Sequence, residues 1–256
     1  MKLLLFDIDG TLIRAGRQVG PIFLGALEET FGRPVQFGNY SFAGRTDSQI
    51  IFELMARSGV SHQEIEATLP EMRDCYLERL ERDLDPRQMT ICPGVVPLLQ
   101  RLSQRDDVAL GLLTGNFRRG AYIKLERLGL DEYFPIGAFG DDGIDRSELP
   151  PIALQRARST YRHPFDSANT VIIGDTPNDI RCARDHGMAV YAVATGTYPL
   201  AQLETGGATW TYADLEPLEQ ALGLRDQVGS SIRSSSSGNS GSSENSGDSN
   251  LPSVPT

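Results

Sequence analysis

The sequence predicts an α/β fold: a doubly wound parallel β-sheet with helices on both faces, extended by an inserted helical cap and a disordered C-terminal tail. Three observations carry this prediction. Short apolar runs alternate with helical patterns over most of the chain, one long stretch has helical patterns alone, and residues 226–256 offer almost nothing that could be buried.

The apolar runs read as strands that are buried on both faces of a parallel sheet, because each is rich in Val, Leu or Ile. They cover residues 3–9, 108–116, 169–176 and 188–196. Helical patterns lie between them at residues 95–104, 119–130, 150–161 and 178–187. In this architecture ligands bind at the carboxyl ends of the strands.

The stretch without strands covers residues 15–90 and places apolar residues at three- and four-residue spacing. An insert that follows the first strand would lie above the carboxyl ends of the sheet, so we interpret it as a cap. The core is then residues 1–14 and 91–225. Residues 226–256 are rich in Ser, Gly and Asn, which cannot offset their ordering entropy by burial, and form the predicted tail.

The net charge of -10 argues against nucleic-acid binding, because an acidic surface repels a phosphate backbone. No apolar run approaches the roughly 20 residues of a membrane span, and the N-terminus lacks a signal-peptide pattern. The three cysteines have no zinc-site spacing. We therefore expect a cytoplasmic protein without a membrane or nucleic-acid partner, as a monomer or homodimer.

The first motif with chemical meaning is DIDGT, which contains Asp7, Asp9, Gly10 and Thr11 and closes the first strand. Carboxylates two residues apart on an extended chain point the same way. One can ligate Mg²⁺ and attack phosphorus, and the other can act as general acid and base. The plainer alternative is that Asp and Gly simply end a strand.

Two further strand ends carry polar clusters. Thr114, Gly115 and Asn116 combine a hydroxyl with backbone N–H groups, which suits a phosphate cradle or a simple helix cap. Asp175 and Asp179 offer hard oxygen ligands that suit Mg²⁺, although Asn178 or Asp179 could simply be an N-cap that complements the helix dipole. Three such clusters on one edge of a sheet are hard to explain by packing alone.

These motifs, FDIDGTL, LLTGN and IIGDTPNDIRCARDHG, resemble those of the haloacid dehalogenase superfamily of phosphotransferases, of the type with a helical cap after the first strand. The resemblance covers residues 1 to about 222. It implies that Asp7 is the nucleophile, Asp9 the general acid and base, and Thr114 a ligand of the transferred phosphoryl group. It also implies that Asp175, Asp7 and the Asp9 carbonyl oxygen hold Mg²⁺, and that Asp179 ligates the ion or orients its waters.

One position departs from the family pattern. The lysine that the family usually carries in a KPxP pattern is replaced by Glu148. A cation is still needed, because the Asp7 carboxylate and a phosphate dianion repel each other. Arg146 is the preferred candidate and Lys124 the second, which would contribute little if Arg146 serves. The alternatives are a surface ion pair for Arg146, with Asp142 or Asp145, and a solvated helix face for Lys124.

In the cap, AGRTDSQI at residues 43–50 resembles a segment of phosphoglycolate-phosphatase-like members. Arg45 could bind a substrate carboxylate or phosphate there. The equal alternative is a helix entry in which Thr46 or Asp47 is the N-cap and Arg45 is solvated.

The sequence thus predicts a Mg²⁺-dependent phosphatase that hydrolyses a small phosphorylated metabolite, phosphoglycolate-like or a sugar phosphate, through an aspartyl-phosphate on Asp7. A phosphomutase of the same superfamily is the first alternative, because nothing in the core separates the two. A catalytically silent interaction module is the second, and the intact pair of Asp7 and Asp9 argues against it.

Overall fold

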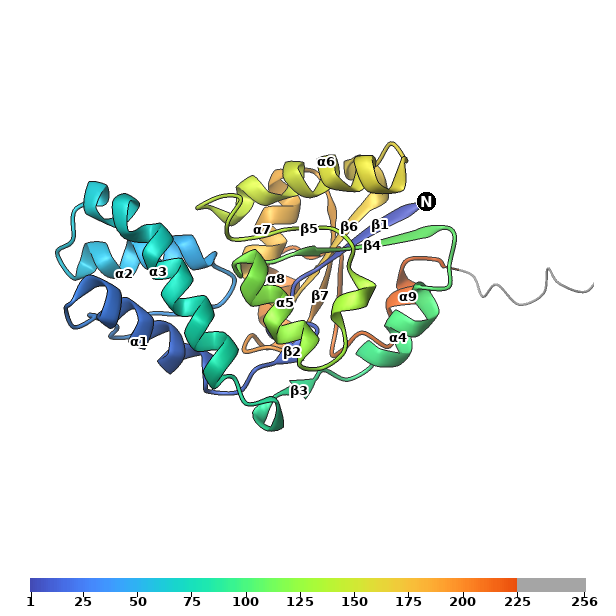
Figure 1. Cartoon of the computed structure of the whole chain (residues 1–256). Helices are drawn as coiled ribbons and strands as arrows, with labels where there is room; N and C mark the ends of the chain where they lie inside the picture. Colours follow the sequence, from blue (N-terminus) through green and yellow to red (C-terminus); the bar gives the residue numbers. More distant parts are fainter. Residues whose placement is uncertain (225–256) are drawn as a thin grey trace, which may run out of the picture.

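Six strands form the central sheet of the protein, in the order β5-β4-β1-β6-β7-β8 (Figure 1). All neighbouring strands are parallel. The strands are β1 Lys2–Phe6, β4 Val108–Leu113, β5 Gly137–Ala138, β6 Thr170–Gly174, β7 Ala189–Val193 and β8 Trp210–Tyr212. The structure is a computed structural model that describes residues 1–224, and the predicted tail at residues 226–256 lies outside the described residues.

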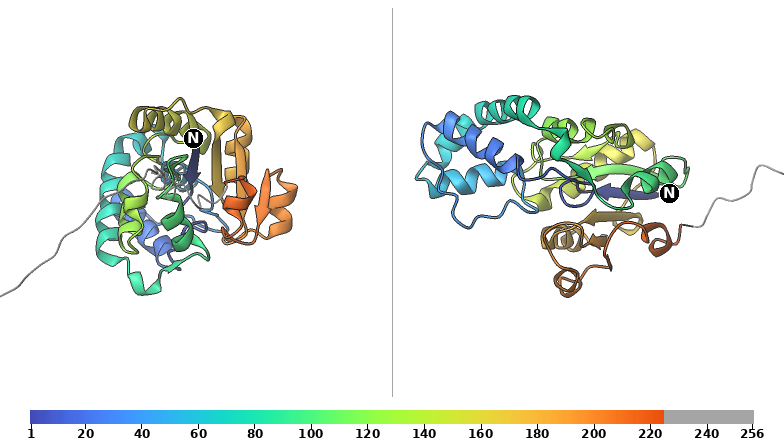
Figure 2. Two further views of the ribbon diagram at one scale, coloured as in Figure 1. Left: turned by 90° about the vertical axis from the view of Figure 1, so that its right-hand side faces the viewer. Right: turned by 90° about the horizontal axis from the view of Figure 1, so that it is seen from below.

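Helices cover both faces of the sheet, as the views in Figure 2 show. Successive residues of β1 point to opposite faces, so Leu4 and Phe6 join one apolar core while Leu3 and Leu5 join the other. The first core is closed by α4 Val95–Leu102, α5 Arg118–Glu126 and α9 Leu218–Ala221. The second is closed by α6 Leu149–Tyr161, α7 Pro177–Asp185 and α8 Leu200–Thr205.

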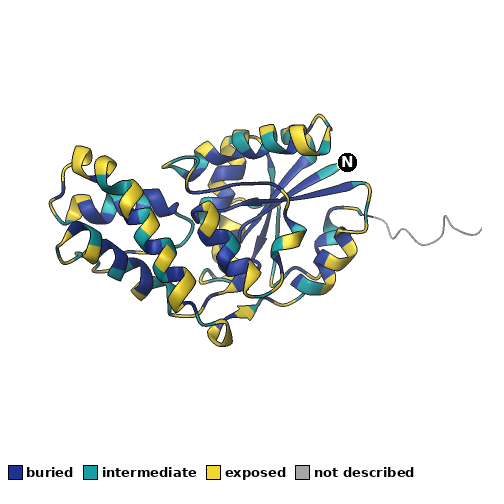
Figure 3. Ribbon diagram, in the orientation of Figure 1, coloured by how far each residue is buried: buried dark blue, intermediate teal, exposed yellow. Residues whose placement is uncertain are grey.

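This double cover explains why the strands are apolar throughout. All residues of β4 and β6 are buried, which appears in Figure 3 as dark blue strands between half-exposed helices. Four short 3₁₀ helices complete the connections: Pro86–Gln88, Asp131–Tyr133, Arg146–Glu148 and Ser167–Asn169.

The helical insert enters and leaves the core through a two-stranded antiparallel sheet of β2 Ile13–Arg14 and β3 Thr90–Ile91. Between these strands lie α1 Val19–Phe31, α2 Asp47–Arg57 and α3 His62–Asp83. Figure 1 shows these helices beyond the carboxyl ends of β1, β4 and β6. Phe23 of α1 packs edge-on against Tyr76 of α3 with ring centroids 4.7 Å apart, which anchors the two helices to each other.

The predicted fold class is confirmed, including the helical insert after the first strand. The four predicted strands and the predicted helices are present, and the three cysteines are free. Sequence analysis missed β2, β3, β5 and β8, each of which is only two or three residues long. Within residues 1–224, none of the helices has the length and apolar character required to cross a membrane.

Candidate active site

The three motif-bearing strands are neighbours in the sheet, so their ends meet at one place. Asp7 directly follows β1, Thr114 follows β4 and Asp175 follows β6. All three line a cavity of about 490 Å³ between the core and the helical insert. This is the edge of a parallel sheet at which ligands bind in doubly wound folds.

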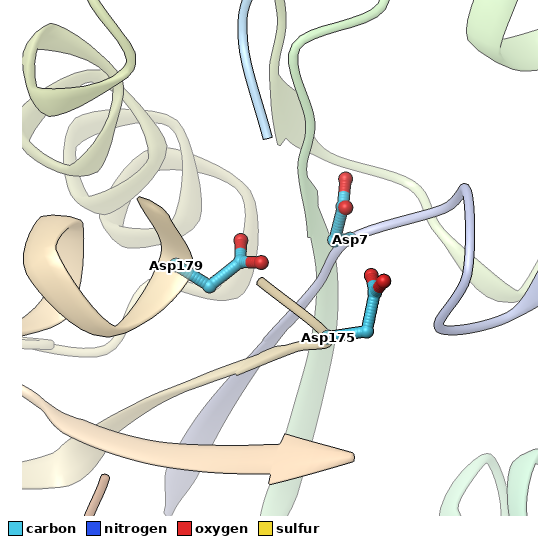
Figure 4. A group of neighbouring side chains, drawn as sticks. All are labelled: Asp7, Asp175 and Asp179. Carbon is cyan, nitrogen blue, oxygen red and sulfur yellow. The ribbon is translucent and has the colours of Figure 1, made fainter. Parts of the chain in front are cut away.

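A cluster of buried carboxylates lies beside this cavity, and two of its members, Asp7 and Asp175, line it. One oxygen atom from each of Asp7, Asp175 and Asp179 lies within 4.8 Å of the others. Figure 4 shows the three side chains converging from the ends of β1 and β6 and from the first turn of α7. All three residues are at least 96 % buried, so their charges are poorly screened by water.

Arg146 is the cation of this cluster. Its Nη2 atom lies 3.2 Å from Oδ1 of Asp7 and 2.5 Å from Oδ1 of Asp179, and it donates to the Leu113 carbonyl oxygen at 3.0 Å. The side chain is 2 % exposed. Burial opposes the charge of the guanidinium, but Asp179 and Asp7 outweigh it and raise the pKa of Arg146.

The alternative of a surface ion pair for Arg146 is therefore wrong. Asp142 is instead paired with Arg156, with Nη1 and Oδ2 2.6 Å apart. Asp145 caps the short helix that begins at Arg146, where its carboxylate accepts from the backbone N–H of Ser147.

Three carboxylates and one guanidinium leave two negative charges in a buried space. Desolvation is the main reason why the pKa of Asp7 rises to about 6 and that of Asp175 to about 8, and the neighbouring carboxylates add to it. A divalent cation among the three carboxylates would balance this charge, and hard oxygen ligands suit Mg²⁺. The residues present thus fit a magnesium site.

Two glycines and a hydroxyl hold the Asp175 carboxylate in place. Thr11 donates its hydroxyl to Oδ1 of Asp175 at 3.1 Å. A Cβ atom on Gly10 or on Gly196 would overlap with the Asp175 carboxylate, and Gly10 has a φ of 89° that other residues rarely adopt. The glycine of the DIDGT motif is therefore required both by its turn and by the approach of Asp175.

Asp179 has a structural role in addition to its place in the cluster. Thr176 is the N-cap of α7, and Oδ2 of Asp179 accepts from the N–H and hydroxyl of Thr176 at 3.0 and 2.7 Å. This is a capping box. The sequence alternative placed the N-cap at Asn178 or Asp179, whereas the N-cap is Thr176. Asp179 lies in the first turn of α7, where its charge also complements the helix dipole.

Asp9 belongs to a second polar group on the other side of the cavity. Its Oδ2 atom accepts from Nζ of Lys124 at 2.6 Å and from Nδ2 of Asn116 at 2.9 Å. Lys124 also donates to Oδ1 of Asn116 at 2.6 Å and is 2 % exposed. Lys124 is thus not on a solvated helix face, which was the alternative for this residue. Asp9 itself keeps a 42 % exposed side chain that can meet a substrate.

The loop after β4 offers fewer free donors than a helix N-terminus usually does. Nδ2 of Asn116 donates to Oγ1 of Thr114 at 2.8 Å, while the backbone N–H groups of Phe117 and Arg118 donate to Asp47 and Asp141. Among the described residues, the N–H of Gly115 has no partner. The available cradle is therefore the Thr114 hydroxyl and the Gly115 amide.

Arg45 lines the cavity from the insert but is held by its neighbours. Its Nη1 atom donates to the Ser41 carbonyl oxygen at 2.6 Å, and its Nε atom lies 3.4 Å from Oε2 of Glu53. The expected helix entry is also present, because Oγ1 of Thr46 accepts from the Gln49 N–H as the N-cap of α2. Both interpretations of Arg45 remain compatible with this position.

Sequence reasoning missed two charged residues that line the cavity. Arg14 donates its Nε–H to the Thr195 carbonyl oxygen at 2.8 Å, and Asp47 reaches in from the insert with 8 % exposure. The sequence carries little signal for either of them. Arg14 lies in a two-residue strand, and Asp47 sits beside a good N-cap residue, so its pattern favours a solvated first-turn acid.

The fold and the carboxylate cluster define an α/β enzyme with an acidic, metal-compatible site under a helical cap. Residues 1–187 match the family model of the haloacid dehalogenase-like hydrolases, and the chain belongs to this family.

Known relatives agree with this assignment. The chain is 27 % identical to a phosphoglycolate phosphatase of Synechococcus elongatus over 87 % of its own length and 97 % of that protein. It shares its fold with a hydrolase from Pseudomonas syringae at a TM-score of 0.63, with 22 % identity over 88 % of this chain and all of the other. A candidate β-phosphoglucomutase from Thermotoga maritima matches at a TM-score of 0.55 and 22 % identity, over 87 % and 99 % of the two chains. The protein is thus an enzyme, a hydrolase whose relatives are phosphatases.

Proposed function

We propose that this hydrolase is a Mg²⁺-dependent phosphatase that cleaves a small phosphate monoester through an aspartyl-phosphate on Asp7. The single observation that supports this most strongly is the buried cluster of Asp7, Asp175, Asp179 and Arg146 at the carboxyl ends of neighbouring strands. A carboxylate beside a compensating cation, at the floor of a ligand-sized cavity, is suited to attack phosphorus.

In the first step, an Asp7 carboxylate oxygen forms a bond to phosphorus while the bond from phosphorus to the ester oxygen breaks. The departing oxygen needs a proton, and Asp9 is the acid best placed to give it, because its carboxylate is two residues away and partly exposed to the cavity. The products of this step are the free alcohol and the phosphorylated Asp7.

In the second step, Asp9 takes a proton from a water molecule whose oxygen attacks phosphorus. The bond between phosphorus and the Asp7 oxygen breaks, which releases inorganic phosphate and restores the Asp7 carboxylate. Lys124 and Asn116 hold Asp9 in one orientation for both proton transfers through their bonds to its Oδ2 atom. The residues of the site therefore suffice for a complete cycle of acid and base steps.

Asp7, Asp175 and Asp179, with the Asp9 carbonyl oxygen, would hold Mg²⁺. When bound, the ion supplies positive charge that reduces the repulsion between the carboxylates and the phosphoryl oxygens. Arg146 supports the same charge balance from the protein side, since its Nη2 atom contacts both Asp7 and Asp179. The Thr114 hydroxyl and the Gly115 N–H are the proposed ligands of the phosphoryl group.

The cavity suits a metabolite rather than a macromolecule. Its volume of about 490 Å³ falls in the range of small-molecule sites, and residues of the helical insert line its entrance. The proposed candidates are sugar phosphates and phosphoglycolate, after which the cyanobacterial relative is named. Arg45 and Arg14 lie on the cavity wall, where they could meet a second anionic group.

A panel of phosphorylated metabolites, assayed for phosphate release with Mg²⁺ and with a chelator, tests this proposal. Asp7→Asn is the matched variant, because it keeps the shape of the side chain and removes the nucleophile. We expect less than about a thousandth of wild-type turnover from it. Phosphate release that persists in Asp7→Asn or after exhaustive chelation would refute the mechanism.

Product analysis separates the phosphatase from the phosphomutase alternative. A phosphatase releases inorganic phosphate in step with the alcohol, whereas a mutase returns the phosphoryl group to a second hydroxyl of the sugar. Substrate that is isomerised without phosphate release would assign the chain to the mutases and leave the role of Asp7 intact.

A further inference from the structure

A short segment of the insert is bonded directly to the loops that carry the catalytic residues. In this docking segment, residues 43–48, three consecutive residues bind three places on the core. Oγ1 of Thr46 donates to the Ile144 carbonyl oxygen at 2.5 Å, and Oγ of Ser48 donates to that of Gly140 at 2.7 Å. Between them, the N–H of Asp47 donates to the Gly115 carbonyl oxygen at 2.7 Å.

The fit between the segment and the core is tight at the backbone level. A Cβ atom on Gly115 would overlap with the carbonyl oxygen of Arg45, and one on Gly44 would meet the side chains of Thr176 and Asn178. Nδ2 of Asn178 also donates to the Ala43 carbonyl oxygen at 3.3 Å. The docking segment thus contacts both the loop after β4 and the start of α7.

Asp47 makes the most informative contact in this segment. Its Oδ2 atom accepts from the backbone N–H of Phe117 at 2.7 Å, at the N-terminus of α5, and its side chain is buried. The positive end of a helix dipole and a charge-assisted hydrogen bond both favour a carboxylate there. The insert therefore places an acid against the turn that contains Thr114, Gly115 and Asn116.

That turn is linked to the reacting groups of the proposed mechanism. Asn116 is one residue before Phe117 and binds Asp9, Lys124 and Thr114 through its side chain. Burial is the main reason why the pKa of Asp47 rises to about 7, and Lys124 is close enough to oppose this rise. A displacement of Asp47 would therefore disturb Phe117 and Asn116, and through the Asn116 side chain it would change the position of Asp9.

We propose that Asp47 is a positioning residue that locks the cap on the core and, through the Phe117 N–H, fixes the phosphate-binding turn and the Asn116–Lys124–Asp9 group. The inference rests on the proposed function for its effect on turnover, whereas the docking itself is independent of it. When Asp47 is bound to the Phe117 N–H, the cap is held over the cavity, and the phosphate-binding groups of Thr114 and Gly115 are aligned with the general acid Asp9.

Limited trypsin digestion tests the docking without any assay of activity. The Arg45–Thr46 peptide bond is pinned against Gly115, so wild-type protein should resist cleavage there. In Asp47→Ala the bond should be cut at least tenfold faster at a temperature well below unfolding, as followed by mass spectrometry. Cleavage after Arg87, whose side chain is 88 % exposed, serves as the internal reference and should keep its rate.

The structure offers a matched control for the effect on turnover. Asp141 binds the next backbone N–H of the same helix, that of Arg118, but it belongs to the core and is exposed. Asp47→Ala should lower kcat/KM on the order of tenfold or more, whereas Asp141→Ala should leave it within about twofold. Asp47→Asn should recover most of the loss, since its amide oxygen can accept from Phe117 without the charge.

Each outcome decides the proposal. Equal losses in Asp47→Ala and Asp141→Ala would reduce Asp47 to a helix-stabilising acid, and unchanged cleavage at Arg45 would overturn the docking role. Should Asp47→Ala unfold, Ser48→Ala removes the adjacent bond to Gly140 and must also raise cleavage at Arg45. A wild type without phosphatase activity would refute the proposed function, while the trypsin comparison would still decide the docking.

Discussion

Arg146 contacts the Asp7 carboxylate through an Nη2–Oδ1 distance of 3.2 Å, and both side chains are almost completely buried. The guanidinium of Arg146 thus supplies the positive charge beside Asp7, although Glu148 occupies the position of the family's usual lysine. Arg146 reaches the site from the first residue of a 3₁₀ helix, two positions before Glu148. The substitution therefore changes the position of the cation in the chain as well as its identity, and a single guanidinium nitrogen, Nη2, contacts both Asp7 and Asp179.

We expect Arg146→Ala to lower kcat on the order of a hundredfold or more, since one charge-stabilising group is lost at the transition state. Arg146→Lys should recover only part of the activity, because the lysine side chain is one atom shorter and places its ammonium farther from Asp7 and Asp179. Steady-state kinetics with a melting curve for each variant check this. Arg156→Ala, which removes a half-buried pair with Asp142, is the control. Wild-type kcat in folded Arg146→Ala would contradict the proposed role.

The buried position of Lys124 changes what its removal should do. Sequence reasoning held that Lys124 would contribute little if Arg146 serves as the cation, but its Nζ atom lies 2.6 Å from Asp9. We expect Lys124→Met to lower kcat about tenfold or more with a smaller effect on KM, because Asp9 loses its orienting partner. Arg119→Met is the control on the same helix, since Arg119 is half-exposed and paired with Glu126. Equal kinetics in both variants would disprove the orienting role.

Mg²⁺ should stabilise the folded protein, because it would bind the native carboxylate cluster and not the unfolded chain. At a hundredfold excess over its Kd, we expect a rise in Tm of roughly 5–10 °C. Asp175→Asn should abolish most of this shift, whereas Asp142→Asn, outside the cluster, should keep it. Thermal melts across a Mg²⁺ titration measure the effect, and an identical shift in Asp175→Asn would place the ion elsewhere.

Without metal, the raised pKa values make stability depend on pH. Asp7 and Asp175 have pKa values of about 6 and 8 in the folded protein against 3.8 ordinarily. Between pH 4 and 8 the folded state therefore holds protons that the unfolded chain has released, so the free energy of unfolding falls as pH rises. Melts in chelator should show a Tm that declines toward pH 8, less steeply in Asp175→Asn. A Tm that climbs steadily from pH 5 to 8 would refute this.

The fold could be predicted because the strands that form the sheet's centre are buried on both faces and hence apolar throughout. The edge strand β8, Trp210–Tyr212, is only half-buried, and β5 has just two residues, Gly137 and Ala138. Neither leaves a periodic pattern long enough to detect. The helices of the insert were found because their apolar residues repeat at helical spacing.

The site was predicted wherever a residue's position follows from its place at the end of a strand, as for Asp7, Thr114 and Asp175. The site was not predicted where the position of a side chain depends on packing between distant parts of the chain. The docking of α2 on the core buries Asp47, and the bond of Lys124 to Asp9 links residues that are far apart in the chain. Single-sequence patterns report local spacing and carry no information on such contacts.

The paired strands β2 and β3 make the helical insert a separable module. Arg14 and Thr90 are direct partners in this ladder, so the chain leaves the core and returns to it at adjacent points. Lengthening or exchanging everything between them leaves the register of the six-stranded sheet untouched. Evolution, or an engineer, can therefore graft a foreign lid at this junction and recruit a new metabolite, and a graft that keeps the docking segment, residues 43–48, also keeps its bonds to the reaction centre.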